Sequence, residues 1–169
     1  DVFFLPFLYG SNAGLEMTGG FYGLQAIHQR AHLLQAVYEG VVFSHMTHLN
    51  RMLARFTAVE AIRITGGPAH SAVWMQMFAD VSGLPVELPQ VEETGCLGAA
   101  MAALVGTGEY TSFPQAQQAL DYPVLHLQPN TTSHQAYQKK YKHYQFLIDA
   151  LQHYHARCAS PTHDEEPTA

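Results

Sequence analysis

The stretch Ile64-Thr-Gly-Gly-Pro-Ala-His-Ser-Ala-Val-Trp-Met-Gln-Met-Phe-Ala-Asp80 decides the fold of this chain. A short β-prone run over residues 61–65 meets Gly66 and Gly67, and we expect a helix to begin a few residues later with Ser71 as its cap. Paired glycines leave no Cβ between the backbone and a ligand, and the start of a helix offers free N–H groups that suit a nucleotide. The same pattern is also typical of a tight turn that binds nothing, so the local sequence leaves both interpretations open.

The spacing of apolar residues predicts strands and helices on both sides of this turn. The expected strands cover residues 2–9, 19–24, 61–65, 85–89 and 124–127, and the expected helices cover about residues 30–56, 72–82, 92–105, 114–120 and 133–156. This order predicts an α/β domain in which helices flank a mixed sheet.

Some side chains within these elements are expected to serve packing. Gly40 lies inside the long helix, where glycine costs about 1 kcal/mol relative to alanine. Close packing of this helix against another backbone would explain the glycine. Trp74 and Phe78 are most simply core residues, and Asp80 is expected to form hydrogen bonds rather than to act as a base. The tyrosine stripe of the last helix is also expected to pack, with hydroxyl groups that need partners if they are buried; it contains Tyr137, Tyr141 and Tyr144.

Length and composition fit one domain with a sizeable core. The chain has 169 residues, of which 47% are hydrophobic and only 13% are charged. So low a fraction of charged residues suggests that part of the surface is covered by a partner. The chain opens with Asp1 and an apolar run, which favours a fragment of a longer protein. We expect residues 1–158 to form the domain and the polar residues 159–169 to be a disordered tail.

Charge and hydropathy argue against two classes of partner. The net charge is −6, and eight Lys and Arg residues are too few and too scattered for a nucleic-acid surface. No apolar run approaches the roughly 20 residues that a membrane span needs. Cys96 and Cys158 do not make a disulfide framework. A reduced, cytoplasmic protein is therefore expected.

Three segments, one of them within the stretch quoted first, carry a family resemblance. The first is Gly19-Gly-Phe-Tyr-Gly-Leu24 with His32-Leu33 and Ala36-Val-Tyr-Glu39, the second is Thr65-Gly-Gly-Pro-Ala-His-Ser71, and the third is Glu93-Thr-Gly-Cys-Leu-Gly-Ala-Ala100. Together they resemble the carboxy-terminal domain of the FGGY carbohydrate kinases, a branch of the actin-like, ribonuclease-H-like ATPase superfamily. Residues 5–12 and 38–45 look most like the L-xylulose kinase branch.

The resemblance implies an ATP-dependent kinase that phosphorylates a sugar hydroxyl, such as that of a ketopentose like L-xylulose. In this family two domains close around a cleft, and the carboxy-terminal domain holds the adenosine. Carried over to this chain, Gly66 and Gly67 lie against the nucleotide and Ser71 faces its adenine or ribose side, while Pro68, Ala69 and His70 line the same turn.

The same resemblance places the reacting groups outside this chain. The phosphate loops and the catalytic aspartate are expected upstream of residue 1, so no catalytic residue and no metal site is assigned here. Mg²⁺ would be held mainly by the ATP phosphates and the missing amino-terminal domain. The implied partners are the sugar, that domain and a second copy in a homodimer. One departure from the family is Glu16-Met-Thr-Gly-Gly20, where an Arg-Gly is often found, which puts any contact of that arginine in doubt.

Several patterns have a second interpretation. The pairs His28 with His32 and His45 with His48 have a spacing that can hold zinc on a helix, but no third ligand accompanies them, which favours ordinary helix histidines.

Glu92 and Glu93 fit either an acid–base pair or an acidic first turn of a helix, and the acidic turn is favoured. For the whole chain, the alternatives to a kinase are a chaperone-like, non-enzymatic actin-fold ATPase module and a structural or dimerising half without nucleotide binding.

Overall fold

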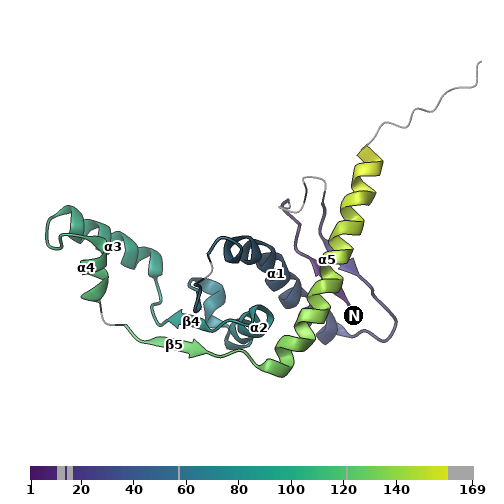
Figure 1. Cartoon of the computed structure of the whole chain (residues 1–169), viewed down its shortest axis with the longest axis horizontal. Helices are drawn as coiled ribbons and strands as arrows, with labels where there is room; N and C mark the ends of the chain where they lie inside the picture. The colour runs from purple at the N-terminus through teal and green to yellow at the C-terminus, as the bar shows by residue number, and fades with distance from the viewer. Residues whose placement is uncertain (11–13, 15–16, 57, 121, 160–169) are drawn as a thin grey trace, which may run out of the picture. The chain divides into compact units, whose positions relative to one another are not determined.

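The computed structural model describes residues 1–10, 14, 17–56, 58–120 and 122–159 (Figure 1). The chain forms two compact units, one of Asp1–Met52 with the part of the last helix from Gln135 onward, and one of Leu53–His134. The elements are β1 (Phe3–Leu5), β2 (Gly20–Tyr22), α1 (Arg30–Leu53), β3 (Ile62–Arg63), the 3₁₀ turn η1 (Gly67–His70), α2 (Ala72–Ser82), β4 (Val86–Pro89), α3 (Thr94–Gly106), α4 (Phe113–Gln118), β5 (Val124–Leu127) and α5 (Thr131–Ala159).

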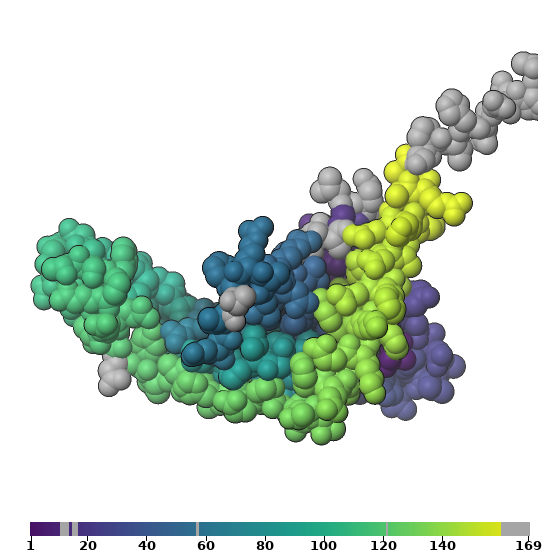
Figure 2. Space-filling model, viewed as in Figure 1, coloured from purple at the N-terminus to yellow at the C-terminus, as the bar shows by residue number. Residues whose placement is uncertain are grey.

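The first unit pairs β1 with β2 in an antiparallel ribbon and packs aromatic rings between its helices. Phe4 lies opposite Phe21, with ring centroids 5.0 Å apart. Phe43 of α1 is buried against Tyr141 and Tyr144 of α5, at centroid distances of 5.5 and 5.3 Å. Figure 2 shows the first residues of the chain, in purple, against the yellow-green part of α5. The predicted packing role of the tyrosine stripe is confirmed.

The hydroxyl groups of these tyrosines differ. Tyr141 accepts a hydrogen bond from Asn50 Nδ2 at 3.3 Å. The hydroxyl of Tyr144 is buried without a partner among the described residues, contrary to the expectation that a buried hydroxyl finds one. Burial, and then the neighbouring Tyr141, raise the pKa of Tyr144 above its ordinary value because the charged phenolate is poorly solvated there.

At Gly40, α1 lies directly against the backbone of β1. A Cβ at this position would collide with the carbonyl oxygen of Phe4 and would lie 3.0 Å from the carbonyl carbon of Phe4. The predicted close packing against another backbone is therefore confirmed, and Gly40 is required by contact rather than by a turn.

A buried ion pair lies beside this contact. Glu39 is only 2% exposed, and its Oε2 accepts a hydrogen bond from Lys140 Nζ at 2.6 Å. Gln35 Nε2 donates to the other carboxylate oxygen at 2.8 Å. Both oxygens of this buried carboxylate are thus satisfied.

The second unit is built on the three-stranded sheet β3-β4-β5. β3 pairs with β4 in parallel, and β4 pairs with β5 antiparallel, which confirms the predicted mixed sheet. On one face, Met75 and Ala79 of α2 pack on Val86 and Leu88 of β4. Partly buried residues complete this core, and they include the predicted Trp74 and Phe78 along with Ile62, Ile64, Ala69 and Leu127.

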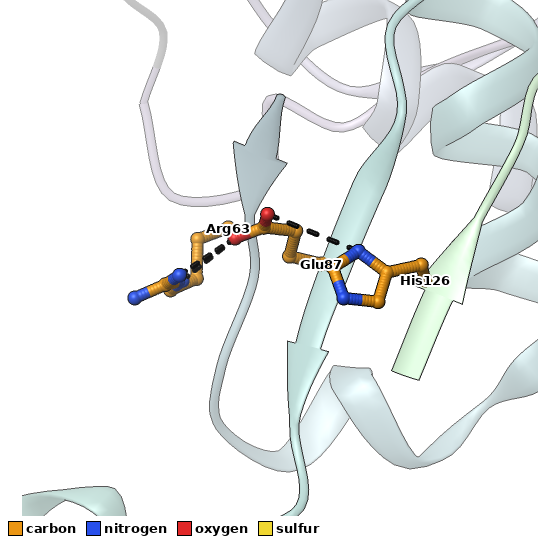
Figure 3. Close-up of polar contacts among 3 residues, drawn as sticks. All are labelled: Arg63, Glu87 and His126. Carbon is orange, nitrogen blue, oxygen red and sulfur yellow. Dashed lines mark hydrogen bonds and ion pairs between the residues drawn. The ribbon is translucent and has the colours of Figure 1, made fainter. Parts of the chain in front are cut away.

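The opposite face of this sheet carries polar side chains, because successive residues of a strand point to opposite faces. Arg63, Glu87 and His126 lie side by side on the three strands (Figure 3). Arg63 Nη2 lies 2.7 Å from Glu87 Oε2, and His126 Nδ1 lies 3.8 Å from Glu87 Oε1. These contacts agree with the strand register, which pairs Arg63 with Glu87 and Glu87 with His126.

Local signals fix both ends of α2. The Ser71 side chain accepts from Trp74 N at 3.4 Å, and Gly83 ends the helix with φ +73°. Asp80 Oδ1 accepts hydrogen bonds from Gln76 Nε2 and Asn130 N, both at 2.8 Å, which confirms its predicted bonding role.

Other boundaries differ from the sequence-based expectation. α1 ends at Leu53 and β3 covers only Ile62–Arg63, while α3 begins at Thr94, after both glutamates. α5 extends to Ala159, and the rest of the expected tail, residues 160–169, lies outside the described residues.

Candidate functional site

The site is built on the turn that joins β3 to α2. Gly66 has φ +92° and ψ −175°, a conformation that essentially only glycine adopts. Ala69 N donates to Gly66 O at 3.0 Å and Ser71 N donates to Pro68 O at 3.1 Å, which closes a 3₁₀ turn that the sequence pattern did not reveal. Apart from the glycine itself and its chain neighbours, no described atom lies within 4 Å of a Cβ built on Gly66 or Gly67. The backbone of both glycines is therefore open.

A cleft of about 420 Å³ lies beside this turn, between it and the segment that follows β4. One wall is formed by residues of the turn and the start of α2, and the other by the end of β4 and the loop that leads to α3. The lining residues are Thr65, Gly66, Ala69, His70, Ala72, Leu88, Pro89, Gln90, Val91, Glu92 and Leu125.

The structure divides the predicted site residues into two groups. Gly66, Ala69 and His70 line the cleft. Gly67, Pro68 and Ser71 belong to the same turn but are not among the lining residues. Ser71 acts as the cap of α2.

Polarity within the cleft is uneven. Leu88 and Leu125 supply apolar surface, Gln90 supplies an amide, and Glu92 supplies the one carboxylate among the described lining residues. No Lys or Arg is among them. Such a cleft suits an uncharged, partly apolar group with hydroxyls better than a chain of phosphates, which needs cations or free N–H groups.

The adjacent carboxylates Glu92 and Glu93 have different surroundings. Glu92 lines the cleft, whereas Glu93 occupies the position before α3 without a side-chain cap hydrogen bond. No local pattern in the sequence predicts that Glu92 lines the cleft, because its position depends on the path of the loop after β4.

His28 and His32, which lie just before and within the first turn of α1, form local hydrogen bonds. His28 Nδ1 accepts from Gln25 N at 2.8 Å, and His32 Nδ1 accepts from Gln29 N at 2.9 Å, so both rings satisfy backbone N–H groups before and at the start of α1. Burial, and then His48, lower the pKa of His45. Among the described residues, no group of three His, Cys, Asp or Glu side chains could hold a metal ion.

Comparison with known proteins identifies the family. The model of the FGGY family of carbohydrate kinases, C-terminal domain, matches residues 1–107. The chain belongs to this family. The FGGY assignment confirms the resemblance seen in the three sequence segments.

Individual relatives agree with the assignment to the FGGY family. The chain is 72% identical over 162 residues, which are 96% of its length and 32% of the relative, to the L-xylulose/3-keto-L-gulonate kinase of Escherichia coli (strain K12). It is 54% identical over 151 residues, 89% of its length and 30% of the relative, to the probable L-xylulose kinase of Pasteurella multocida. The chain thus spans about a third of the length of these relatives.

A solved FGGY kinase structure supports the fold. The ligand-bound xylulose kinase from Lactobacillus acidophilus superimposes with a TM-score of 0.79 at 25% identity, over 89% of this chain and 31% of that one. The expected actin-like, ribonuclease-H-like fold is confirmed. None of the described helices combines the length and the apolar character that a membrane crossing requires.

Proposed function

We propose that this chain is the nucleotide-binding part of an ATP-dependent carbohydrate kinase that transfers the γ-phosphate of ATP to a sugar hydroxyl. The observation that carries the proposal is the 72% identity, over 96% of the chain, to an L-xylulose/3-keto-L-gulonate kinase. The acceptor is a ketopentose such as L-xylulose. The matched relatives are sugar kinases by name, which favours this function over a chaperone-like ATPase module.

The turn after β3 supplies the binding surface. Gly66 and Gly67 offer backbone with no side chain above it, so a nucleotide can lie against it at van der Waals distance. Pro68, Ala69 and His70 form the 3₁₀ turn that holds this backbone in place, and Ser71 fixes the start of α2 next to it. These six residues constitute the proposed nucleotide site.

The chemistry of phosphoryl transfer is divided between two parts of the enzyme. It needs a bound and oriented nucleotide, a metal-neutralised phosphate chain and a base for the attacking hydroxyl. This chain contributes the first of these. Mg²⁺, which neutralises the phosphates when ATP binds, would be held mainly by the phosphates and the amino-terminal domain, which also supplies the catalytic aspartate and sugar contacts. A cytoplasmic location and a homodimer stay predictions.

A glycine substitution tests the nucleotide site. In the complete kinase, Gly67→Asp places a carboxylate at an open position of the turn, where it repels the phosphates and crowds the nucleotide. Gly67 has no positive φ, so the fold should tolerate the change. We expect the affinity for ADP, measured by calorimetry, to fall at least tenfold. This corresponds to a loss of about 1.4 kcal/mol in binding free energy.

Gly106→Asp is the matched control, because Gly106 also has open space around it among the described residues but lies at the end of α3, outside the turn after β3. It should leave ADP binding unchanged. Equal ADP affinity in Gly67→Asp and the unmodified kinase would show that the turn does not bind nucleotide and would favour a structural role for this chain. A panel of ketopentoses and pentitols tests the acceptor, and failure to phosphorylate any of them would contradict the kinase proposal.

A further inference from the structure

We propose that Glu92 recognises the ribose of the nucleotide by accepting hydrogen bonds from its 2′- and 3′-hydroxyl groups. The inference rests on the proposed nucleotide-binding function and deepens it, because it assigns the second wall of the cleft. That wall is formed by the loop after β4, which the expected site residues do not include.

The position of Glu92 sets it apart from its neighbour. Glu92 lines the same cleft as Gly66 and His70, although it stands 26 positions after Gly66 in the sequence. It is solvent-exposed and forms no hydrogen bond or ion pair with another residue in the described part of the chain. Its carboxylate is therefore available to a ligand in the cleft without first breaking an internal contact.

The charge of the cleft restricts which part of a nucleotide can occupy it. Among the described lining residues Glu92 supplies a negative charge, and no Lys or Arg offsets it. Phosphate groups next to this carboxylate would be repelled. The nucleoside part of the ligand therefore occupies the Glu92 side, and the phosphates extend away from it.

The donor pattern of the nucleoside selects the ribose over the base. A carboxylate has two oxygens that only accept hydrogen bonds, and the 2′- and 3′-hydroxyls of ribose can both donate. On adenine, the donating N6 amino group lies between N1 and N7, which are acceptors that a carboxylate repels. A carboxylate that binds a ribose hydroxyl also occurs in dinucleotide-binding folds.

The apolar residues of the cleft complete the arrangement. Leu88 is 3% exposed and Leu125 is 47% exposed, and both line the cleft together with Val91. Gln90 Nε2 donates to Leu88 O at 2.9 Å, which fixes this amide against the strand. The base can rest on the apolar surface while Glu92 holds the sugar ring, a division typical of small-molecule sites.

Deoxynucleotides test the assignment in the complete kinase. The affinities of ADP, 2′-deoxy-ADP and 3′-deoxy-ADP are measured by calorimetry for the unmodified protein, for Glu92→Gln and for Glu93→Gln. We expect the unmodified protein to bind ADP about tenfold or more tightly than either deoxy form, because hydrogen bonds to a charged acceptor are among the stronger ones. In Glu92→Gln, ADP should weaken by a similar factor, and the ratio between ADP and the deoxy forms should fall toward one.

Glu93→Gln is the matched control, since Glu93 is the adjacent exposed carboxylate and does not line the cleft. It should keep the ratio of the unmodified protein. Equal binding of ADP and both deoxy forms by the unmodified protein overturns the assignment without any variant. A ratio in Glu92→Gln equal to that of the unmodified protein also overturns it.

The two proposals fail differently. If the unmodified kinase does not bind ADP, the nucleotide-binding function itself is wrong. If ADP binds and Gly67→Asp weakens it, but Glu92→Gln leaves the ribose preference intact, only the role of Glu92 is wrong.

Discussion

Replacement of Gly40 by alanine tests the contact between α1 and β1. Considered as a helix residue alone, Gly40→Ala should stabilise the protein by about 1 kcal/mol, because alanine has the higher helix propensity. The structure predicts the opposite sign. The new methyl group would collide with the carbonyl oxygen of Phe4 and would lie 3.0 Å from its carbonyl carbon and 3.2 Å from its Cβ. Carbon atoms pack best at roughly 3.5–4.0 Å, so α1 and β1 would have to separate.

The magnitude follows from what the methyl group meets. Overpacking of a core costs about 1–3 kcal/mol, and the upper end applies where the neighbour is backbone and cannot rotate away. The carbonyl of Phe4 belongs to β1, which is paired with β2. About 3 kcal/mol of strain less about 1 kcal/mol of helix propensity leaves a net loss of about 2 kcal/mol in the free energy of unfolding.

The assay compares urea unfolding of the complete kinase, Gly40→Ala and Gly98→Ala, with tryptophan fluorescence and far-ultraviolet circular dichroism as probes. Gly98 is the matched control, because it also lies inside a helix and a Cβ built on it meets no described atom within 4 Å beyond its chain neighbours and the backbone of its own helix. Gly98→Ala should therefore be neutral or stabilising by up to about 1 kcal/mol. Equal or greater stability of Gly40→Ala would refute the reasoning, since it would show that α1 and β1 do not touch at this point.

Further predictions concern buried polar groups and pH. Tyr144→Phe removes a hydroxyl that is buried without a partner among the described residues, so it should raise the free energy of unfolding by up to about 1 kcal/mol; a loss of similar size would reveal a hydrogen bond. Lys140→Met leaves the carboxylate of Glu39 buried without its cation and should lower the free energy of unfolding by about 3–5 kcal/mol. Adding Glu39→Gln should recover most of this loss. An unchanged unfolding midpoint in the single variant would contradict the ion pair. Partial burial and then His48 lower the pKa of His45, so the folded protein favours the neutral imidazole. The resulting contribution to the free energy of unfolding is present above the ordinary pKa of 6.5 and is lost as the pH falls below it. His45→Gln should therefore show a smaller decrease in melting temperature than the unmodified protein between about pH 7.5 and pH 5, and an identical decrease in both would refute this.

Features that depend on a few neighbouring residues could be predicted from the sequence. α2 is an example, since Ser71 starts it and Gly83 ends it through hydrogen bonds and backbone angles within one turn. Gly40 is another, because a glycine inside a long helix has few physical explanations other than close contact. The mixed sheet followed from the order of apolar strands and helices.

Features that depend on distant segments could not be predicted from the sequence. Glu92 and Glu93 are chemically identical neighbours, and only the path of the loop after β4 places one of them in the cleft. That the Tyr144 hydroxyl finds no partner among the described residues depends on how α1 and α5 pack, which no local pattern encodes. The 3₁₀ turn after Gly66 is short, and its hydrogen bonds come from an irregular segment where propensities say little.

The backbone angles of the glycine turn have a consequence for which mutations the gene can accumulate. Gly66 has φ +92° and ψ −175°, which residues with a Cβ essentially never adopt, whereas Gly67 has no positive φ and open space around it. Every missense change in a glycine codon introduces a Cβ. Purifying selection should therefore remove all of them at codon 66, while alanine or serine at codon 67 would persist in a saturation library and only bulkier or acidic replacements would be lost.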